Sequence, residues 1–288
     1  MSSEGAAAAS GDGYYYDNDD SFNFYLELWG GESLHVGIFD GTEEVSPEEC
    51  GKASHKSLDK LISYCVPALS GGGKRAMDMG SAYGGTARAL CTTFDCDVVC
   101  IDLSVKENAL NRDKSAAAGL GDRIIIPGDY SFDDTKEESN SCDCVVSQES
   151  ILHAGDSREA VVAEAARVLK KGGLFVFSDL METDFVASGA LDKVYKRIGL
   201  KDMATPARYI QWATKAGMRL RWYEDHSEQV AHHYGFIKKI LLQAETRARL
   251  QGKVSDAYIE QMLVGLQAWV EASNANSLTW GYFVFEKM

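Results

Sequence analysis

Short apolar runs alternate with stretches of helical periodicity along most of the 288-residue chain. Five such runs predict buried strands, at 76–79, 97–102, 123–129, 142–148 and 174–179. Apolar residues at helical spacing predict helices at 86–90 and 157–170 between these strands. Strands and helices that alternate at this pace favour an α/β fold, in which a mostly parallel sheet carries helices on both faces.

The second half of the chain is less regular, but it adds two strands and brings the expected sheet to seven. The pattern predicts a helix at 206–217, a strand at 219–223, long helices at 227–250 and 255–272, and a last strand at 278–285. Ligands of open α/β sheets bind at the carboxyl ends of the strands. We therefore expect the long helices to cap a closed pocket for a small molecule.

A glycine-rich turn follows the first predicted strand and carries the clearest chemical signal. The strand ends at Asp78 and leads into Gly80, Gly84 and Gly85. A side chain at Gly80 would block the approach of a ligand to the backbone. The second strand ends at Asp102, which can accept both ribose hydroxyls, and the third ends in an acid at 129, which is placed to accept from an adenine amino group. Three acids at three strand ends fit S-adenosylmethionine.

Two other interpretations of the turn remain open. A dinucleotide dehydrogenase has the pattern G-x-G-x-x-G, whereas this chain has G-x-x-x-G-G. Asp78 before the turn would repel a pyrophosphate and attract a sulfonium ligand with an amino-acid tail. A tight turn between strand and helix, without any ligand, is the other interpretation.

These patterns divide the chain as follows. We expect residues 1–20 to form a low-complexity, disordered tail and 21–288 to form a single domain. A helical lid over 21–74 includes a helix that starts near Pro47 and continues through 57–68. The remaining boundaries are a cofactor-binding core at 75–180, an acceptor cap with helices at 181–277, and the final strand at 278–288.

Composition narrows the set of partners. The net charge of −14 argues against nucleic acid and anionic membranes. We find neither an apolar run of about 20 residues nor an apolar signal core at the N-terminus, so a cytoplasmic location is expected. The seven cysteines favour reduced, buried thiols, and the spacing of Cys91, Cys96 and Cys100 predicts no metal site. Either a monomer or a homodimer is compatible with the sequence.

Several motifs together resemble one branch of the class I S-adenosylmethionine-dependent methyltransferases. The glycine turn and Asp102 are similar to the first two motifs of that class. The segments that resemble the glycine sarcosine and sarcosine dimethylglycine N-methyltransferases, which make glycine betaine, are 15–20, 24–25, 29–32, 35–37, 147–153, 232–234 and 278–281. The resemblance covers nearly the whole chain. It implies a Rossmann-like fold, S-adenosylmethionine as methyl donor, no metal, and a small-molecule carboxylate as acceptor.

The turn, the strand ends and the resemblance together give a set of candidate site residues. For cofactor binding these are Asp78, Gly80, Ser81, Gly84, Asp102, Leu103, Asp129, Tyr130, Gln148, Tyr25 and Trp29. For substrate binding they are His153, Met181, Tyr234 and Trp280. His153 is the candidate catalytic residue, because an amine acceptor must be kept unprotonated in order to attack.

One departure from the family leaves the acceptor open. In the betaine enzymes the stretch after strand five resembles Asp-Pro-Met, and an arginine or threonine often precedes it. This chain has Ser178-Asp179-Leu180-Met181 instead. An arginine that could hold a substrate carboxylate is therefore missing from this stretch. N-methylation of sarcosine and dimethylglycine stands beside S-methylation of 4-methylthio-2-hydroxybutyrate toward dimethylsulfoniopropionate. A non-catalytic subunit that binds S-adenosylmethionine is a more distant alternative.

Overall fold

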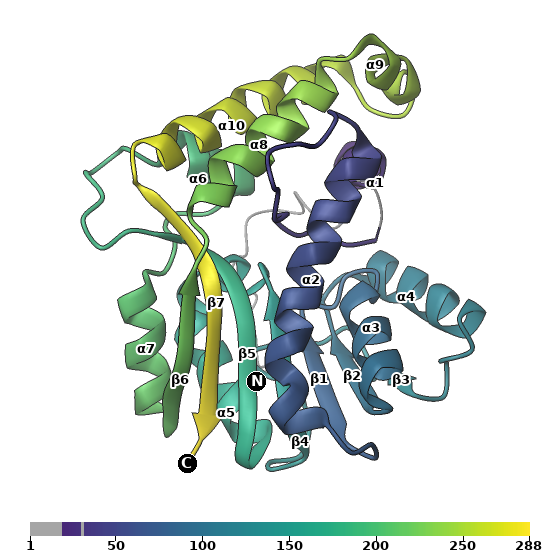
Figure 1. Ribbon diagram of the computed structural model, residues 1–288, viewed down its shortest axis with the longest axis vertical. Coiled ribbons are helices and arrows are strands. Elements are labelled where there is room, and N and C mark those ends of the chain that lie inside the picture. The colour runs from purple at the N-terminus through teal and green to yellow at the C-terminus, as the bar shows by residue number, and fades with distance from the viewer. Residues whose placement is uncertain (1–18, 30–31) are drawn as a thin grey trace, which may run out of the picture.

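The computed structural model describes residues 19–29 and 32–288 (Figure 1). Helix α1, Asp19–Leu28, begins two residues inside the predicted tail. The rest of that tail, with Tyr15 and Tyr16 of the N-terminal motif, lies outside the described residues, as do Gly30 and Gly31.

The centre of the fold is a seven-stranded sheet, as the sequence predicts. Its strands lie in the order β3-β2-β1-β4-β5-β7-β6, and β7 runs antiparallel to both of its neighbours, β5 and β6. The strands are β1 Arg75–Met79, β2 Asp97–Ile101, β3 Ile124–Ile125, β4 Cys142–Gln148, β5 Leu169–Glu182, β6 Met218–Asp225 and β7 Leu278–Lys287.

Helices cover both faces of the sheet and one of its ends. The helices after α1 are α2 Pro47–Leu69, α3 Gly85–Phe94, α4 Val105–Ala117, α5 Arg158–Val168, α6 Asp192–Ile198, α7 Pro206–Lys215, α8 Glu228–Leu241, α9 Ala244–Leu250 and α10 Asp256–Asn274, with a 3₁₀ segment η1 at Ile151–Ser157. Figure 1 shows α6, α8, α9 and α10 above the carboxyl ends of the parallel strands, with α1 beside them. The predicted cap over the strand ends is therefore present.

Two separate cores follow from the alternation of side chains along the strands. On one face Ala76 and Val146 pack with Leu61 of α2. On the other face Met77 and the neighbouring strands pack with Val161 of α5, together with residues of α7. Because both faces are covered, the central strands are apolar at nearly every position, which explains why the sequence pattern located them.

Other boundaries differ from the prediction. The expected strand 123–129 pairs only over β3, and its last residue rejoins the sheet as a single bridge between Asp102 and Asp129. The expected helix 227–250 divides into α8 and α9, with Gln243 in extended conformation between them. Helix α5 ends at Val168, and the chain enters β5 directly, because Leu169 already pairs with Cys142 of β4.

The lid is fastened to the rest of the molecule by charged and aromatic contacts. Glu32 forms ion pairs with Arg88 of α3 and with Lys114 of α4, the latter at 2.6 Å. Phe22 of α1 packs edge-on against Tyr83 in the glycine turn, with ring centroids 5.7 Å apart. These contacts hold α1 and the segment after it over the carboxyl end of β1.

Gly84, the N-cap of α3, offers a test of this packing. Its φ is +76°, and a Cβ there would lie 1.9 Å from the side-chain oxygen of Asn111 in α4. We predict that Gly84→Ala lowers the free energy of unfolding by about 3 kcal/mol, from backbone strain and overpacking together. Gly119→Ala is the control, because Gly119 has φ +71° but an open surrounding, and it should lose only about 1 kcal/mol. Equal losses in urea unfolding would contradict the packing argument.

Candidate active site

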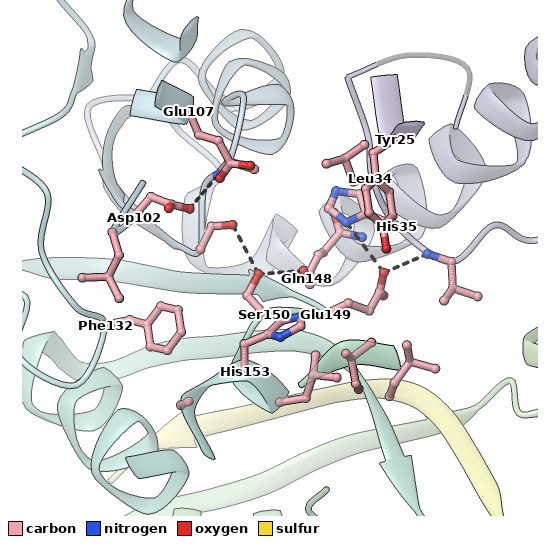
Figure 2. A pocket seen from close by; sticks show the side chains of 18 of the residues that line it. Tyr25, Leu34, His35, Asp102, Glu107, Phe132, Gln148, Glu149, Ser150 and His153 are labelled. Atoms are coloured by element: carbon pink, nitrogen blue, oxygen red, sulfur yellow. Dashed lines mark hydrogen bonds and ion pairs between the residues drawn. The ribbon is translucent and has the colours of Figure 1, made fainter. Parts of the chain in front are cut away.

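A cavity of about 190 Å³ lies at the carboxyl ends of the strands, beneath the lid and the cap (Figure 2). Its wall includes predicted residues from every part of the chain: Tyr25, Trp29, Gly80, Asp102, Leu103, Gln148, His153 and Tyr234. The structure therefore brings together residues that are up to about two hundred positions apart in the sequence.

The glycine turn and the end of β2 form one end of the cavity. Asp102 is 5 % exposed, and its carboxylate accepts the backbone N–H groups of Ala82 at 3.0 Å and Ser104 at 2.9 Å. Each carboxylate oxygen has a further lone pair for a ligand. A Cβ on Gly80 would lie 2.3 Å from Ser150, and φ at Gly80 is +80°, so both space and backbone conformation require glycine here.

Several buried polar atoms around this end have no partner among the described residues. They are the Nε2 of Gln148, the hydroxyl of Ser81 and one carboxylate oxygen of Asp78. Burial, and then the carboxylate of Asp102, raises the pKa of Asp78 to about 7. A buried polar atom without a partner costs free energy, and a polar ligand would satisfy it. Of these three residues Gln148 lines the cavity, and its Nε2 together with Gly80 fits a polar ligand such as a sulfonium nucleoside with an amino-acid tail.

Glu107 adds an acid that the sequence analysis did not select. It lies in the first turn of α4, is 8 % exposed, and lines the cavity near Asp102 (Figure 2). Burial, and then the carboxylate of Asp102, raises its pKa to about 8. The sequence did contain a signal for Glu107, because an acid lies shortly after the end of the second strand. It was not recognised because helix α4 was not predicted.

The third strand end differs from the expectation. Asp129 is exposed, its carboxylate accepts the side-chain amide of Asn108 at 2.8 Å, and it does not line the cavity. Tyr130 also lies outside the lining and packs near Gly128. Phe132, which Figure 2 shows facing the cavity, takes this place in the wall. The structure does not bring Asp129 into the cavity wall, because β3 ends early and the chain turns before residue 132, so its contact with an adenine group stays a prediction.

The opposite end of the cavity contains a buried arginine. Arg197 of α6 is 4 % exposed and donates a hydrogen bond to the hydroxyl of Tyr25 at 3.0 Å. Its guanidinium lies 5.3 Å from the ring centroid of Tyr234 and 5.9 Å from that of Trp269. The faces of these two aromatic rings stabilise a cation that is removed from water. Tyr234, predicted to contact substrate, therefore also holds Arg197.

Arg197 supplies a cation that the stretch after strand five lacks, since Ser178-Asp179-Leu180-Met181 contains no arginine. Among the described residues that line the cavity, it is the one Lys or Arg side chain. The motif after strand five could not reveal it, because it comes from a short helix in an irregular part of the chain. The available signal was an arginine on the apolar side of a short helix, next to Val194 and Ile198.

Glu149 is a buried acid in the wall of the same cavity. It follows β4 and has a left-handed backbone, with φ +47°. Its Oε1 accepts from the hydroxyl of Ser178 at 2.7 Å and from the indole N–H of Trp280 at 2.8 Å, and its Oε2 accepts the backbone N–H of Val36 at 2.8 Å. Burial raises the pKa of Glu149 to about 7. The sequence analysis quoted Glu149 within a motif but gave it no role.

The three histidines of the cavity are uncharged at neutral pH. Burial, and then the cations of Arg158 and Arg197, lowers the pKa of His153 to about 4. Burial likewise lowers the pKa of His35 to about 4 and that of His233 to about 3. His153 is held on η1, where its backbone N–H donates a hydrogen bond to the backbone carbonyl of Ser150 at 3.0 Å. It is placed to hydrogen-bond an acceptor, but such a low pKa makes it a weak proton acceptor.

Five further predicted residues lie behind the wall, among them Asp78 in β1. Met181 is fully buried in the core with α7, and Trp280 reaches the site through Glu149. Ser81 and Gly84 stand in the turn behind Gly80. Of these, Met181 has the weakest connection with an acceptor, because β5 directs it to the opposite face of the sheet from Leu180, which does line the cavity.

The remaining sequence expectations concern metals and membranes. In the described parts of the chain, no group of three or more His, Cys, Asp or Glu side chains could hold a metal ion. All seven cysteines are buried and free. Over the same residues, none of the helices combines the length and the apolar character that crossing a bilayer requires.

This combination of a seven-stranded sheet with an antiparallel β7, a glycine turn and an acid-lined cavity defines a class I methyltransferase. Residues 77–177 match the family model of the methyltransferase domain. S-adenosylmethionine is the methyl donor of this class, so the protein is an S-adenosylmethionine-dependent methyltransferase of small molecules.

Comparisons over the full length identify the branch. The chain is 38 % identical to a sarcosine/dimethylglycine N-methyltransferase of Halorhodospira halochloris, over 95 % of this chain and 94 % of that protein. It is 36 % identical to a dimethylglycine N-methyltransferase of Parasynechococcus marenigrum, over 98 % of both chains. A structure from Galdieria sulphuraria, assigned as a sarcosine dimethylglycine methyltransferase, superposes with a TM-score of 0.86 at 31 % identity and covers 95 % of this chain and 98 % of that one. The chain belongs to the sarcosine/dimethylglycine N-methyltransferase family.

The geometry of Asp102 leads to a prediction about the cofactor. We expect Asp102→Ala to weaken binding of S-adenosylmethionine by about 2 kcal/mol or more, because two ribose hydroxyls would lose a charged acceptor. Asp97→Ala is the control, since Asp97 is an exposed acid at the other end of β2. Calorimetry on the folded variants measures both affinities. An unchanged affinity for Asp102→Ala would contradict the ribose assignment.

Proposed function

We propose that this protein transfers methyl groups from S-adenosylmethionine to the nitrogen of sarcosine and dimethylglycine, producing glycine betaine. Family membership supports the reaction, since relatives with this activity in their names align over nearly the entire chain. The observation that carries the proposal is the pair of opposite charges, Arg197 and Glu149, in the wall of one small cavity.

These two residues are complementary to an amino acid. Sarcosine and dimethylglycine carry a carboxylate and an ammonium group about two bonds apart. Arg197 offers a planar guanidinium that can hold a carboxylate through two hydrogen bonds. Glu149 offers a buried carboxylate to the ammonium. A zwitterion neutralises both groups at once, which lowers the cost of keeping either of them out of water.

The charges favour an amine over a thioether acceptor. The acceptor 4-methylthio-2-hydroxybutyrate has a carboxylate for Arg197 but no cation for Glu149, and would leave that acid unpaired. Its product sulfonium would gain such a partner, but only after transfer. We therefore place N-methylation ahead of S-methylation.

The residues of the chain mainly bind, orient and exclude water. The bound donor supplies a methyl carbon activated by its sulfonium. Arg197 and Glu149 fix the two ends of the acceptor, and His153 is available as a neutral hydrogen-bond partner. Trp29 and Tyr25, with ring centroids 4.5 Å apart, form the lid side of the wall and keep water away from the nitrogen. Positioning of this kind accounts for much of the rate in such a displacement.

We further propose a reducing, cytosolic setting and an acceptor pocket that involves no metal. The first rests on seven free and buried cysteines. The second rests on the chemistry, because a sulfonium methyl group is activated without a Lewis acid.

A panel of acceptors tests the proposed function directly. The purified protein is incubated with labelled S-adenosylmethionine and, in turn, glycine, sarcosine, dimethylglycine and 4-methylthio-2-hydroxybutyrate. We expect label to enter the sarcosine and dimethylglycine arms. Label in the thioether arm alone would contradict N-methylation, and label in none of the four would contradict the whole substrate class.

Arg197 provides a second test, with a matched control on the same helix. We expect Arg197→Met to raise the KM for dimethylglycine about a hundredfold, because the substrate carboxylate loses its bidentate partner, while the affinity for S-adenosylmethionine stays within about twofold. Lys196→Met removes the same charge from an exposed position of α6 and should change neither value. A normal KM in folded Arg197→Met would mean that the carboxylate binds elsewhere.

A further inference from the structure

Glu149 is bound by donors from three parts of the chain that are far apart in sequence. Val36 belongs to the lid segment, Ser178 to β5 and Trp280 to β7, and all three donate to its carboxylate at 2.7 to 2.8 Å. The left-handed backbone at Glu149, with φ +47°, turns the side chain from the end of β4 into the cavity. Strain in a non-glycine residue is retained where a precise side-chain direction is needed.

The three donors leave part of the carboxylate available. Oε1 accepts two hydrogen bonds, from Ser178 and Trp280, whereas Oε2 accepts one, from Val36. A carboxylate has about four acceptor sites, two on each oxygen. The His35 Nδ1 lies 3.7 Å from Oε2, which is beyond normal hydrogen-bond distance. Val36 is the one hydrogen-bond donor described for Oε2, so this oxygen has a second acceptor site for a ligand.

Among the titratable groups around Glu149, none is better suited than Glu149 itself to accept a proton near pH 7. His35 from the lid and His153 from η1 both have pKa values of about 4 and stay neutral. Asp179 of β5 is buried and its pKa is raised to about 8, and the pKa of Tyr282 in β7 is raised well above its usual range, so both are neutral at pH 7. Arg197, in the same wall, is the cation that the substrate carboxylate would neutralise.

We infer that Glu149 is the proton acceptor of the reaction: its Oε2 contacts the acceptor's ammonium and takes the proton that must leave before methyl transfer. This assignment rests on the proposed function, since a thioether acceptor has no such proton. It replaces His153 in the role that the sequence suggested. Sarcosine and dimethylglycine then enter as the abundant zwitterions and are deprotonated in the cavity.

The step balances in atoms and charge. The N–H bond of the ammonium breaks, its electron pair stays on nitrogen, and the proton joins Oε2 of Glu149. The nitrogen lone pair then forms the N–C bond while the carbon–sulfur bond of the sulfonium breaks with its pair on sulfur. For sarcosine and dimethylglycine alike, one proton passes to Glu149 in each cycle and leaves to solvent after the products depart. Burial raises the pKa of Glu149 to about 7, and it lowers the pKa of the bound ammonium because it disfavours the charged form. The difference between the two pKa values is therefore smaller in the cavity than in water.

The pH dependence of kcat/KM tests this assignment. In water at pH 7 only about one in a thousand of these amines is unprotonated, because their basicity is near that of lysine. If Glu149 accepts the proton, kcat/KM of the wild type for dimethylglycine rises through about pH 7 as Glu149 ionises, and it levels off above about pH 8. Glu149→Gln should lose about a hundredfold or more at pH 7, then gain tenfold per pH unit up to about pH 9.5, because only free amine reacts.

Two further variants separate a chemical role from a structural one. Ser178→Ala removes one hydrogen bond to the carboxylate, which raises the pKa of Glu149, so the rising limb should move to higher pH by about half a unit while the plateau persists. Asp179→Asn is the comparison variant below about pH 8, since Asp179 is a buried carboxyl that bonds Tyr209, lies outside the cavity and, with a pKa raised by burial to about 8, is neutral there, as the Asn would be. Its profile should keep the position and the shape of the wild-type curve.

The outcomes distinguish this assignment from the proposed function. If the wild type methylates neither sarcosine nor dimethylglycine, the proposed function fails. If it does, and Glu149→Gln keeps the plateau above pH 8, the proton acceptor is another group and the assignment is overturned. Urea unfolding and cofactor binding establish whether Glu149→Gln is folded. If it is not, the Ser178→Ala curve decides, and an unshifted limb in that variant also overturns the assignment.

Discussion

The shape of the cavity depends on three hydrogen bonds to one buried carboxylate, that of Glu149 at the end of β4. Glu149 is stable there because Val36 of the lid converges on it with Ser178 and Trp280, which come from the paired strands β5 and β7. An acid without these donors would remain protonated or draw water into the cavity. The same hydrogen bonds that keep Glu149 buried also join the lid to the sheet, so the shape of the pocket and its chemistry have a common origin.

Burial of opposite charges in one cavity explains how a very acidic protein can bind an anionic group. The net charge of −14 disfavours carboxylates at the surface in general. Inside the cavity, Arg197 packs against the rings of Tyr234 and Trp269. It is buried and therefore far less hydrated than a surface arginine. Selectivity thus arises from local geometry and desolvation, whereas the overall charge acts mainly on long-range encounters.

The sequence revealed those parts of the molecule that follow from local chemistry. The strands were predictable because they are apolar on both faces, and the turn was predictable because Gly80 adopts a conformation that few other residues tolerate. Helix α4 was missed because its buried positions are polar, Asn108 and Asn111 among them, so it has no apolar stripe. Arg197 and the function of Glu149 were missed because their partners are long-range: the donors and aromatic rings that define them come from segments whose proximity only the tertiary structure creates.

Helix α1 touches both ends of the cavity at once, through Phe22 on Tyr83 and through Tyr25 on Arg197. A rigid helix that bridges two subsites cannot uncover one of them alone. Each methyl group requires a fresh donor, so the spent donor must leave after every transfer, and the opening that releases it also exposes the acceptor. For the proposed function, this geometry favours the release of dimethylglycine between the first and the second methyl transfer.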